Sequence, residues 1–170
     1  MYNKPVAYFI TFTTYGTWLH GDPRQSVIRD NGIPKLIAPN EHLYRQKMEK
    51  LKHSPVELDQ NQRVIVLDTL IQHCLLKQWR LFAAHVRSNH VHALIQASHG
   101  IDEVMTGLKI WATRKLREGG YSYPKVWTVG GSKRYIFTNE KLCEKIHYVI
   151  YEQGAMMQYY LDSSFQSLVL

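Results

Sequence analysis

Two histidines separated by one residue are the strongest chemical signal in the chain. His90 and His92 flank Val91, and the apolar residues after them favour a β-strand that begins at the pair. Successive side chains of a strand point to opposite faces, so both imidazoles project from the same face. Two adjacent imidazoles can hold one divalent ion, provided that a third ligand comes from elsewhere in the chain. The sequence therefore predicts a metal site on a strand.

A second group of functional side chains lies on a helix predicted from Asn139 to Glu152 or Gln153 and closed by Gly154. A tyrosine hydroxyl attacks a phosphate usefully only when a metal or cation polarises that phosphate. Tyr148 and Glu152 are four residues apart and share a helix face, whereas Gln153 lies about 140° around from Tyr148. Gln153 can join Tyr148 only if the last helical turn loosens, and the glycine that follows allows this.

The composition points to a polyanionic partner. The 170 residues carry a formal net charge of +7, and the isoelectric point is about 9.4. Phosphate contacts supply most sequence-independent affinity for nucleic acid, so this charge is consistent with a nucleic-acid partner, although many small basic proteins bind no acidic partner. The 11 tyrosines and 4 tryptophans add faces on which unpaired bases can stack, although core packing accounts for most of them.

The elements that must position these groups follow from hydrophobic periodicity and turn residues. A strand at 6–14 opens the fold, and four of the six prolines fall between Pro23 and Pro55. We interpret about 20–60 as a surface insertion with a short helix at 41–50. The remaining predicted elements are a helix at 61–77, strands at 79–86 and 91–97, a helix at 102–118, a strand at 133–138 and the tyrosine helix.

This order is close to the split β-α-β arrangement of ferredoxin-like folds. The predicted class is α+β, with an antiparallel sheet, helices on one face and an added C-terminal helix, in a single domain over residues 1–170. No run of apolar residues is long enough to span a bilayer, and the N-terminus does not have the pattern of a signal peptide, so we expect a cytoplasmic protein without membrane contact. Cys74 and Cys143 are too few for a disulfide framework.

Taken together, these residues resemble the IS200-like, single-tyrosine transposases of the HUH type, including relatives associated with repetitive extragenic palindromes. The likeness is carried by the His-Val-His segment and by four further segments, and it omits only about residues 20–60. The matching segments are Tyr8–Trp18, Ser88–Ile95, Met105–Glu118, Val126–Ser132 and Ile146–Gly154.

The resemblance implies a mechanism. His90 and His92 would bind Mg²⁺ or Mn²⁺ with an oxygen ligand from Gln153 or Glu152, and Tyr148 would attack single-stranded DNA to leave a 5′-phosphotyrosine link. The reserve nucleophile is Tyr151. The implied partners are a hairpin-forming single strand and a second copy of the chain, with no nucleotide cofactor. Candidates for cradling the DNA hairpin are Lys109, Arg114, Lys115, Arg117, Lys133 and Arg134.

One spacing departs from the family pattern. In its better-known members the nucleophile and the metal-binding glutamine are four residues apart, which here pairs Gln153 with Val149 and not with a tyrosine. A relative that binds structured DNA or RNA without cutting it is therefore the alternative. A rolling-circle initiator or relaxase uses the same histidine pair, but usually in a longer chain.

Overall fold

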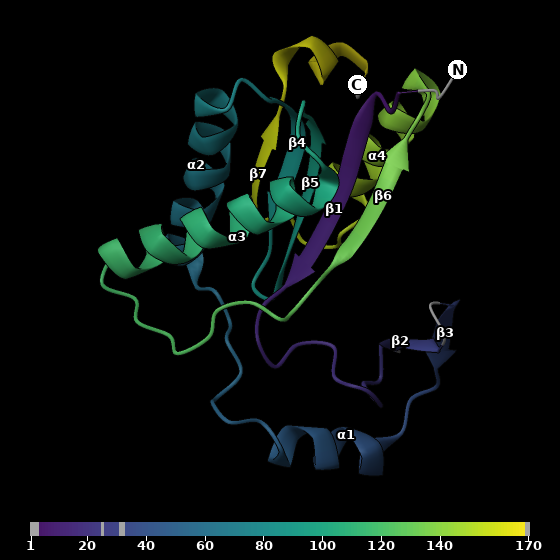
Figure 1. Cartoon of the computed structure of the whole chain (residues 1–170), viewed down its shortest axis with the longest axis vertical. Helices are drawn as coiled ribbons and strands as arrows, with labels where there is room; N and C mark the ends of the chain where they lie inside the picture. Colours follow the sequence, from purple (N-terminus) through teal and green to yellow (C-terminus); the bar gives the residue numbers. More distant parts are fainter. Residues whose placement is uncertain (1–3, 25, 31–32, 169–170) are drawn as a thin grey trace.

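The computed structural model describes residues 4–24, 26–30 and 33–168, and its centre is a five-stranded antiparallel sheet. The strands lie in the order β6-β1-β5-β4-β7 (Figure 1). Their bounds are β1 Ala7–Thr13, β4 Arg80–Val86, β5 His90–Gln96, β6 Ser132–Ile136 and β7 Gln158–Leu161. The helices are α1 Glu41–Glu49, α2 Gln60–Leu76, α3 Ile101–Glu118 and α4 Asn139–Tyr151, with a short 3₁₀ helix at Ser163–Leu168.

The first four of these strands have the ferredoxin-like arrangement that the sequence predicted. Helix α2 connects β1 to β4, and α3 connects β5 to β6, while β5 pairs between β1 and β4. The units β1-α2-β4 and β5-α3-β6 are thus split β-α-β units, because another strand lies between the two strands of each. The predicted α+β class with an antiparallel sheet is confirmed.

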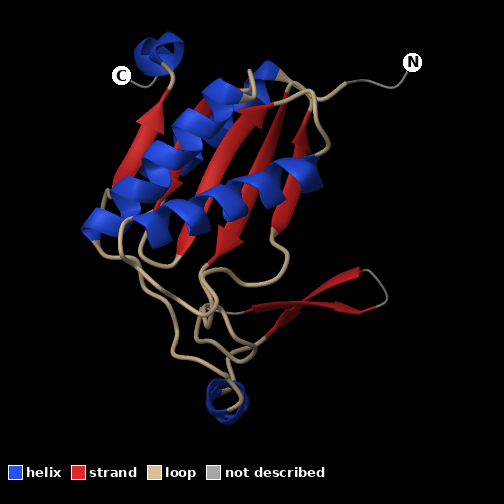
Figure 2. Ribbon diagram, turned by 60° about the vertical axis from the view of Figure 1, so that its left-hand side comes forward, coloured by secondary structure: helices blue, strands red, loops and turns tan. Residues whose placement is uncertain are grey.

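The helices cover both faces of the sheet. Helices α2 and α3 lie together across one face (Figure 2), where Ile10, Val91 and Leu108 are fully buried. Helix α4 packs on the opposite face, where Leu94 and Ile146 belong to a second core cluster. The added C-terminal helix therefore covers the face that a two-helix ferredoxin-like unit leaves open, and alternate residues of β5 enter different cores.

Local signals explain where α2 and α4 begin. Asp59 and Gln62 form a capping box at the start of α2, and the hydroxyl of Thr138 accepts a hydrogen bond from the backbone of Lys141 at the start of α4. The α4 helix ends at Tyr151, with Glu152 as the C-cap residue. The helix is therefore shorter at its end than the periodicity predicted.

Two features of the chain differ from the prediction. The tail forms a strand, β7, which pairs with β4 in the same chain, with Tyr159 opposite His85. The insertion contains a hairpin of β2, Ser26–Asp30, and β3, Ile33–Ile37, in addition to the predicted helix α1. These strands are short and lack a clear alternation of apolar and polar residues. The pairing of β7 depends on a strand that is distant in sequence, and the pairing of β2 with β3 depends on the short segment that joins them.

The hairpin and α1 lie beyond the end of the main sheet at which β1 ends and β5 begins (Figure 1). Backbone hydrogen bonds tie the ends of this segment to the sheet, from Leu58 N to Ser88 O and from Thr14 N to Asn89 O. Among the described residues, no helix is both long enough and apolar enough to cross a membrane.

Candidate functional site

The two histidines occupy neighbouring positions at the start of β5. In the register of the sheet, His90 lies opposite Thr13 of β1, and His92 lies between Thr11 of β1 and His85 of β4. The ring centres of His90 and His92 are 4.7 Å apart, and both side chains are buried on the face covered by α4. The strand therefore presents both imidazoles on one face, as its alternation predicted.

His90 is held in one tautomer. Its Nδ1 lies 2.7 Å from Oδ1 of Asn89, and because an amide oxygen only accepts, Nδ1 carries the proton. Nε2 is then an unprotonated lone pair, and it is buried without a hydrogen-bond partner among the described residues. A buried acceptor without a partner costs about 1–3 kcal/mol, so this nitrogen is suited to a ligand.

His92 has partners on both ring nitrogens. Nδ1 lies 2.7 Å from the hydroxyl oxygen of Thr11, and Nε2 lies 3.0 Å from Oε1 of Gln153. With the amide oxygen as acceptor, Nε2 donates and Nδ1 accepts from the hydroxyl. A hydroxyl can also accept, so Thr11 supports the other tautomer equally well, in which Nε2 presents a lone pair.

Gln153 reaches the histidines because it lies outside the helix. Helix α4 ends at Tyr151, and Glu152 has φ −103° and ψ 18°, so the helical angle between residues 148 and 153 no longer applies. The Gln153 amide nitrogen donates to the carbonyl oxygen of Tyr148 at 3.1 Å, which directs its oxygen toward His92. The loosened turn that the following glycine allowed is thus the observed one.

Glu152 does not join the histidine pair. Its carboxylate lies 3.0 Å from Nδ1 of His147, and both side chains are more than half exposed. Helical spacing places this carboxylate beside Tyr148, but its position at the C-cap turns it toward His147. Among the described residues, no three His, Cys, Asp or Glu side chains gather where they could hold a metal. The oxygen that the end of α4 presents to the pair is the amide Oε1 of Gln153, 3.0 Å from Nε2 of His92.

The protonation of the two imidazoles suits ligation. Burial lowers the pKa of His90 to about 4, with a further contribution from the charge of Arg87. Burial also lowers the pKa of His92 to about 3, assisted by the neighbouring His90. Both rings are therefore neutral near pH 7, which is the form that binds a metal ion without first losing a proton.

Tyr148 lies beside the histidines in a cavity of about 310 Å³. Its ring centre is 5.9 Å from that of His92, and the Lys145 ammonium is 5.1 Å from the Tyr148 ring centre. Arg134 of β6 contributes a second cation to the lining of the same cavity. The full lining consists of Phe9, Thr11, Trp18, His92, Ser132, Arg134, Lys145 and Tyr148.

Tyr151 lies elsewhere. It is 44% exposed and packs its ring against His147 at 5.2 Å, outside the lining of the Tyr148 cavity. Of the two tyrosines named from the sequence, the structure brings only Tyr148 to the histidine pair.

A third histidine on the same face has a structural role. His85 is fully buried, and its Nδ1 lies 2.8 Å from the carbonyl oxygen of Val149. Its Nε2 accepts a hydrogen bond from the Met157 backbone at 3.1 Å. Because both nitrogens are engaged, His85 fastens the end of α4 and the following loop to the sheet, and so fixes Gln153.

Sequence reasoning named Trp18 only as the end of the segment Tyr8–Trp18 and gave it no role in the site. Its indole stacks on His90 with ring centres 5.1 Å apart and an interplanar angle of 29°. The guanidinium of Arg24 lies over the Trp18 ring, 5.9 Å from its centre. Arg24 is also ion-paired with buried Asp22. The backbone of Trp18 has a positive φ of 51°, a conformation rare outside glycine. No local sequence signal predicts this contact.

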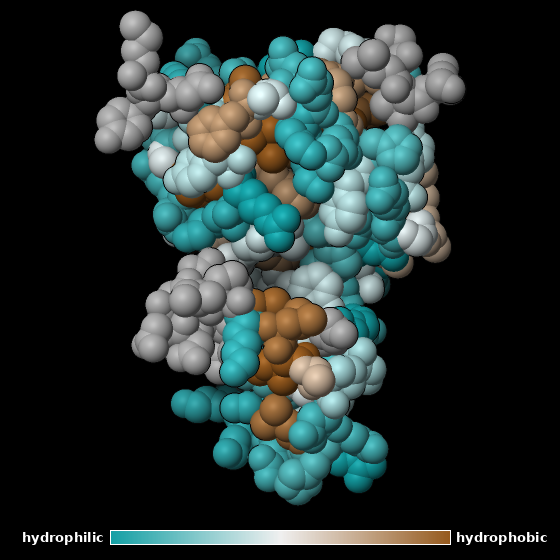
Figure 3. All heavy atoms as spheres, turned by 90° about the vertical axis from the view of Figure 1, so that its right-hand side faces the viewer, coloured by the Kyte–Doolittle hydropathy of each residue, from teal (hydrophilic) through white to brown (hydrophobic). Residues whose placement is uncertain are grey.

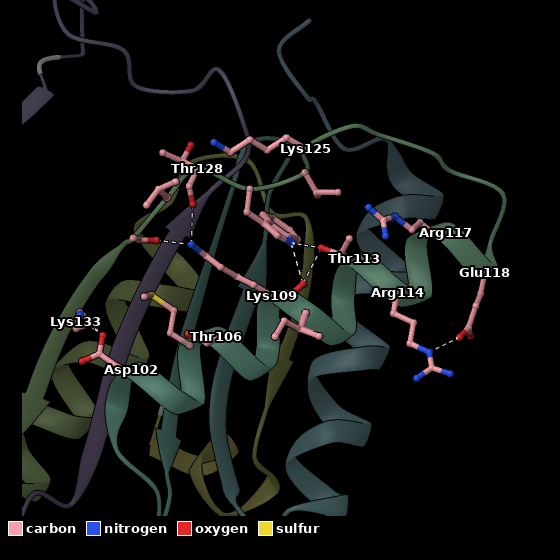
Figure 4. Close-up of a pocket in the computed structure, with 16 residues that line it drawn as sticks. Asp102, Thr106, Lys109, Thr113, Arg114, Arg117, Glu118, Lys125, Thr128 and Lys133 are labelled. Carbon is pink, nitrogen blue, oxygen red and sulfur yellow. Dashed lines mark hydrogen bonds and ion pairs between the residues drawn. The ribbon is translucent and has the colours of Figure 1, made fainter. Parts of the chain in front are cut away.

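The six basic residues named from the sequence do not form one surface. Lys109, Arg114, Arg117 and Lys133 line a groove of about 980 Å³ on the α3 face (Figure 4). Arg134 lines the Tyr148 cavity on the other face. Lys115 is not part of the groove lining, although it is ion-paired with Glu118, which is. The alternation of β6 causes this division, because neighbouring residues point to opposite faces.

Lys109 is partly used by the protein itself. Its ammonium donates hydrogen bonds to the carbonyl oxygens of Thr128, at 2.8 Å, and Gly130, and Figure 4 shows the side chain reaching toward this loop. Burial lowers the pKa of Lys109 to about 8, with a contribution from the charge of Lys125. Lys109 therefore anchors the loop that forms one wall of the groove.

This position predicts a pH dependence of stability. An unfolded lysine has a pKa of about 10.4, so between pH 8 and about 10.4 the unfolded chain binds more protons than the folded chain. The free energy of unfolding therefore rises with pH over this range. The stability gained when Lys109 is neutral is complete above about pH 10.4 and is lost as the pH falls to 8. We expect the free energy of unfolding, relative to Lys109→Met, to rise over this range in urea titrations. A difference that stays constant with pH contradicts the assignment.

No protein-family profile matches the sequence, and no curated protein sequence matches it. Among solved structures, the chain is similar to a REP-associated tyrosine transposase bound to a REP hairpin, with 12% identity and a TM-score of 0.52 over 89% of this chain and 68% of that one. A candidate transposase from Deinococcus radiodurans R1 matches with 14% identity and a TM-score of 0.45 over 91% of this chain and 95% of that one. The chain shares the fold of the first of these structures.

Proposed function

We propose that this protein, which has the fold of a REP-associated tyrosine transposase, is itself an IS200-like, single-tyrosine transposase. It binds hairpin-forming single-stranded DNA and cleaves and rejoins it through a 5′-phosphotyrosine intermediate. The observation that carries this proposal is the convergence of two buried imidazoles, the Gln153 amide oxygen and Tyr148 beside one cavity. A shared fold alone does not fix a function, so the proposal depends on this site.

The donor set fits a divalent ion such as Mg²⁺ or Mn²⁺. Nε2 of His90 is a buried lone pair that has no hydrogen-bond partner in the described part of the chain. The ring of His92 lies beside it, and Oε1 of Gln153 is 3.0 Å from Nε2 of His92. A mixed nitrogen and oxygen set with positions left for substrate suits these metals. When bound, the ion supplies polarisation of the scissile phosphate and charge stabilisation of the departing 3′-oxygen.

The reaction requires a nucleophile and a place for the phosphate. The Tyr148 oxygen forms a bond to phosphorus, the phosphorus–O3′ bond breaks, and the departing oxygen takes a proton to become a free 3′-hydroxyl. The phenolic proton is released to solvent. Lys145 and Arg134 line the same cavity and stabilise the negative charge of the phosphate. The phosphotyrosine conserves the bond energy, so no nucleotide cofactor is needed to rejoin the strand.

Residues around the imidazoles position them for this task. Asn89 fixes the tautomer of His90, and Thr11 holds the ring of His92 in either tautomer. Such hydrogen bonds orient metal-binding histidines and raise their basicity.

We propose that the groove beside α3 takes the duplex part of a DNA hairpin. Arg114 and Arg117 line it together with Lys125 and Lys133. Within the described part of the chain, no hydrogen bond or ion pair engages the Arg117 side chain, whereas Arg114 is paired with Glu118. Contacts between such basic side chains and DNA phosphates predict an affinity for the hairpin that falls steeply as salt is added. The proposal of a homodimer rests on the family resemblance, and sedimentation velocity tests it.

One experiment tests the function directly. The purified protein is incubated with a single-stranded oligonucleotide that contains a foldback hairpin and flanking sequence, with Mg²⁺ or Mn²⁺, and the products are separated on a denaturing gel. We expect a covalent protein–DNA adduct and a fragment with a free 3′-hydroxyl, both lost when EDTA is added. Salt-dependent hairpin binding with no adduct under any metal identifies instead a relative that binds structured nucleic acid without cutting it.

Trp18 gives a prediction about the metal. Because its indole covers the ring of His90, Trp18→Ala frees that ring to rotate, while the residue keeps the same Cβ at positive φ. We expect Mn²⁺ affinity, measured by isothermal titration calorimetry, to fall on the order of 10-fold, as for loss of an outer-shell partner. Trp18→Phe retains a stacking ring and restores most of the affinity. Equal Mn²⁺ affinity in the native protein and Trp18→Ala contradicts this role.

A further inference from the structure

The edge strand β6 lies between the Tyr148 cavity and the groove beside α3. It pairs with β1 on one side, and no other described strand pairs with its second edge. Ser132 and Arg134 line the Tyr148 cavity, while Lys133 lines the groove. Five residues of one strand thus separate the two sites, and the alternation of side chains makes both accessible from the same edge.

Two aromatic rings remain exposed on and just after this strand. Tyr135 is 53% exposed and Phe137 is 47% exposed, and their ring centres are 6.3 Å apart at an interplanar angle of 31°. One contact supports Tyr135 from below, an edge-to-face contact with Tyr8 at 5.6 Å. Figure 3 views the molecule from the side that was on the right in Figure 1. Small apolar areas lie among hydrophilic ones on the upper part of this side, and a larger apolar area lies on the lower part. Neighbouring exposed apolar side chains mark an interaction surface more often than single ones do.

The segment places two cations directly before these rings, because residues 133–137 read Lys-Arg-Tyr-Ile-Phe. Lys133 is ion-paired with Asp102, so its charge is partly compensated. Arg134 has no ion pair within the described residues, and Lys145 lines the cavity beside it. Surfaces that bind unpaired nucleic acid without base-specific hydrogen bonds combine positive charge with exposed aromatic rings. The edge of β6 has both.

We propose that the edge of β6 is a binding track for an unpaired DNA segment that leads from the groove beside α3 to the Tyr148 cavity. Bases stack on Tyr135 and Phe137, and the backbone passes Arg134 on its way to Tyr148. This inference rests on the proposed function and names the part of the substrate that reaches the site: the single strand next to the hairpin.

Charge favours DNA over a second copy of the chain at this edge. Arg134 is the central residue of the five-residue strand, so antiparallel pairing of two β6 strands about their centres places it opposite Arg134 of the other copy. Like charges directly opposite each other destabilise strand pairing, and basic residues on an edge strand oppose self-association. The same charges attract phosphate.

The test compares two DNA hairpins with the same stem, one blunt and one with a single-stranded flank, by fluorescence anisotropy with the full chain. For Tyr135→Ala with Phe137→Ala, we expect affinity for the flanked hairpin to fall about 5- to 100-fold, as for loss of base stacking, with the blunt hairpin unaffected. Tyr159→Ala is the matched control, because Tyr159 is 44% exposed on the opposite edge strand. Tyr135→Phe keeps a stacking face and retains flank binding.

A second measurement keeps the test independent of folding. A 5-bromouracil placed in the flank is expected to crosslink to Tyr135 or Phe137 in the native chain under ultraviolet light. Equal losses on both hairpins, or crosslinks confined to other elements, overturn the track. An altered sedimentation coefficient with unchanged flank affinity also overturns it and makes β6 a protein interface. Failure of the native chain to bind either hairpin rejects the proposed function itself.

Discussion

Replacing Tyr148 with phenylalanine is expected to abolish the covalent protein–DNA adduct while leaving hairpin affinity unchanged. The variant removes only the hydroxyl and keeps the ring that packs against Phe9 and His92. Removal of an enzyme nucleophile lowers the rate by factors that reach about 10⁶, so adduct should be undetectable after overnight incubation. Denaturing gels with end-labelled DNA measure the adduct, and anisotropy measures the binding.

Tyr151→Phe is the matched control for this variant. It removes a hydroxyl from the same helix, three residues away, but its ring packs against His147 outside the Tyr148 cavity. Its adduct yield should equal that of the native protein. If Tyr148→Phe still forms adduct and Tyr151→Phe does not, Tyr151 is the nucleophile and α4 must shift during catalysis.

The second large effect is expected from His90→Ala, which removes one of the two proposed imidazole ligands. Mn²⁺ affinity should fall by more than the roughly 10- to 100-fold that loss of an outer-shell partner causes. Adduct formation should be lost at Mn²⁺ concentrations that saturate the native protein. His90 gives a cleaner test than His92, because Nε2 of His90 makes no hydrogen bond among the described residues, whereas His92 is bonded to Thr11 and Gln153.

His147→Ala is the control for the metal experiment. His147 is an exposed histidine on α4, and its Nδ1 lies 3.0 Å from the carboxylate of Glu152. We expect calorimetry to give the native Mn²⁺ affinity for this variant. A loss of Mn²⁺ binding in His147→Ala, with none in His90→Ala, would move the metal site to the pair formed by His147 and Glu152.

The regular parts of the fold and the histidine pair could be predicted from the chain alone. Strand alternation placed His90 and His92 on one face, and the structure sets their rings 4.7 Å apart. The main helices and the strands of the ferredoxin-like unit could be predicted for the same reason, since each has a period that matches burial on one face. Their order then selected the sheet topology, because few antiparallel arrangements connect such elements without crossing.

The short strands could not be predicted in this way. Strand β7 has four residues, and it is stabilised by the free edge of β4, which is more than 70 positions earlier in the chain. The position of Trp18 on His90 likewise depends on the turn after β1, which a backbone hydrogen bond from Thr14 N to Asn89 O ties to the turn before His90. Contacts of this kind leave no periodic signal, because they join segments that are distant in sequence.

The proposed third donor, Gln153, shows where local reasoning ends. On an ideal helix, Glu152 accompanies Tyr148 and Gln153 faces away, so residue spacing alone left both as candidates. In the structure the helix stops at Tyr151, and His85 and the Gln153 amide fix the turn that follows. Sequence determined which groups are present and which elements carry them, since these depend on side-chain type and period. Only the tertiary structure decided that Gln153 meets His92, because that contact depends on where one helix ends against a distant strand.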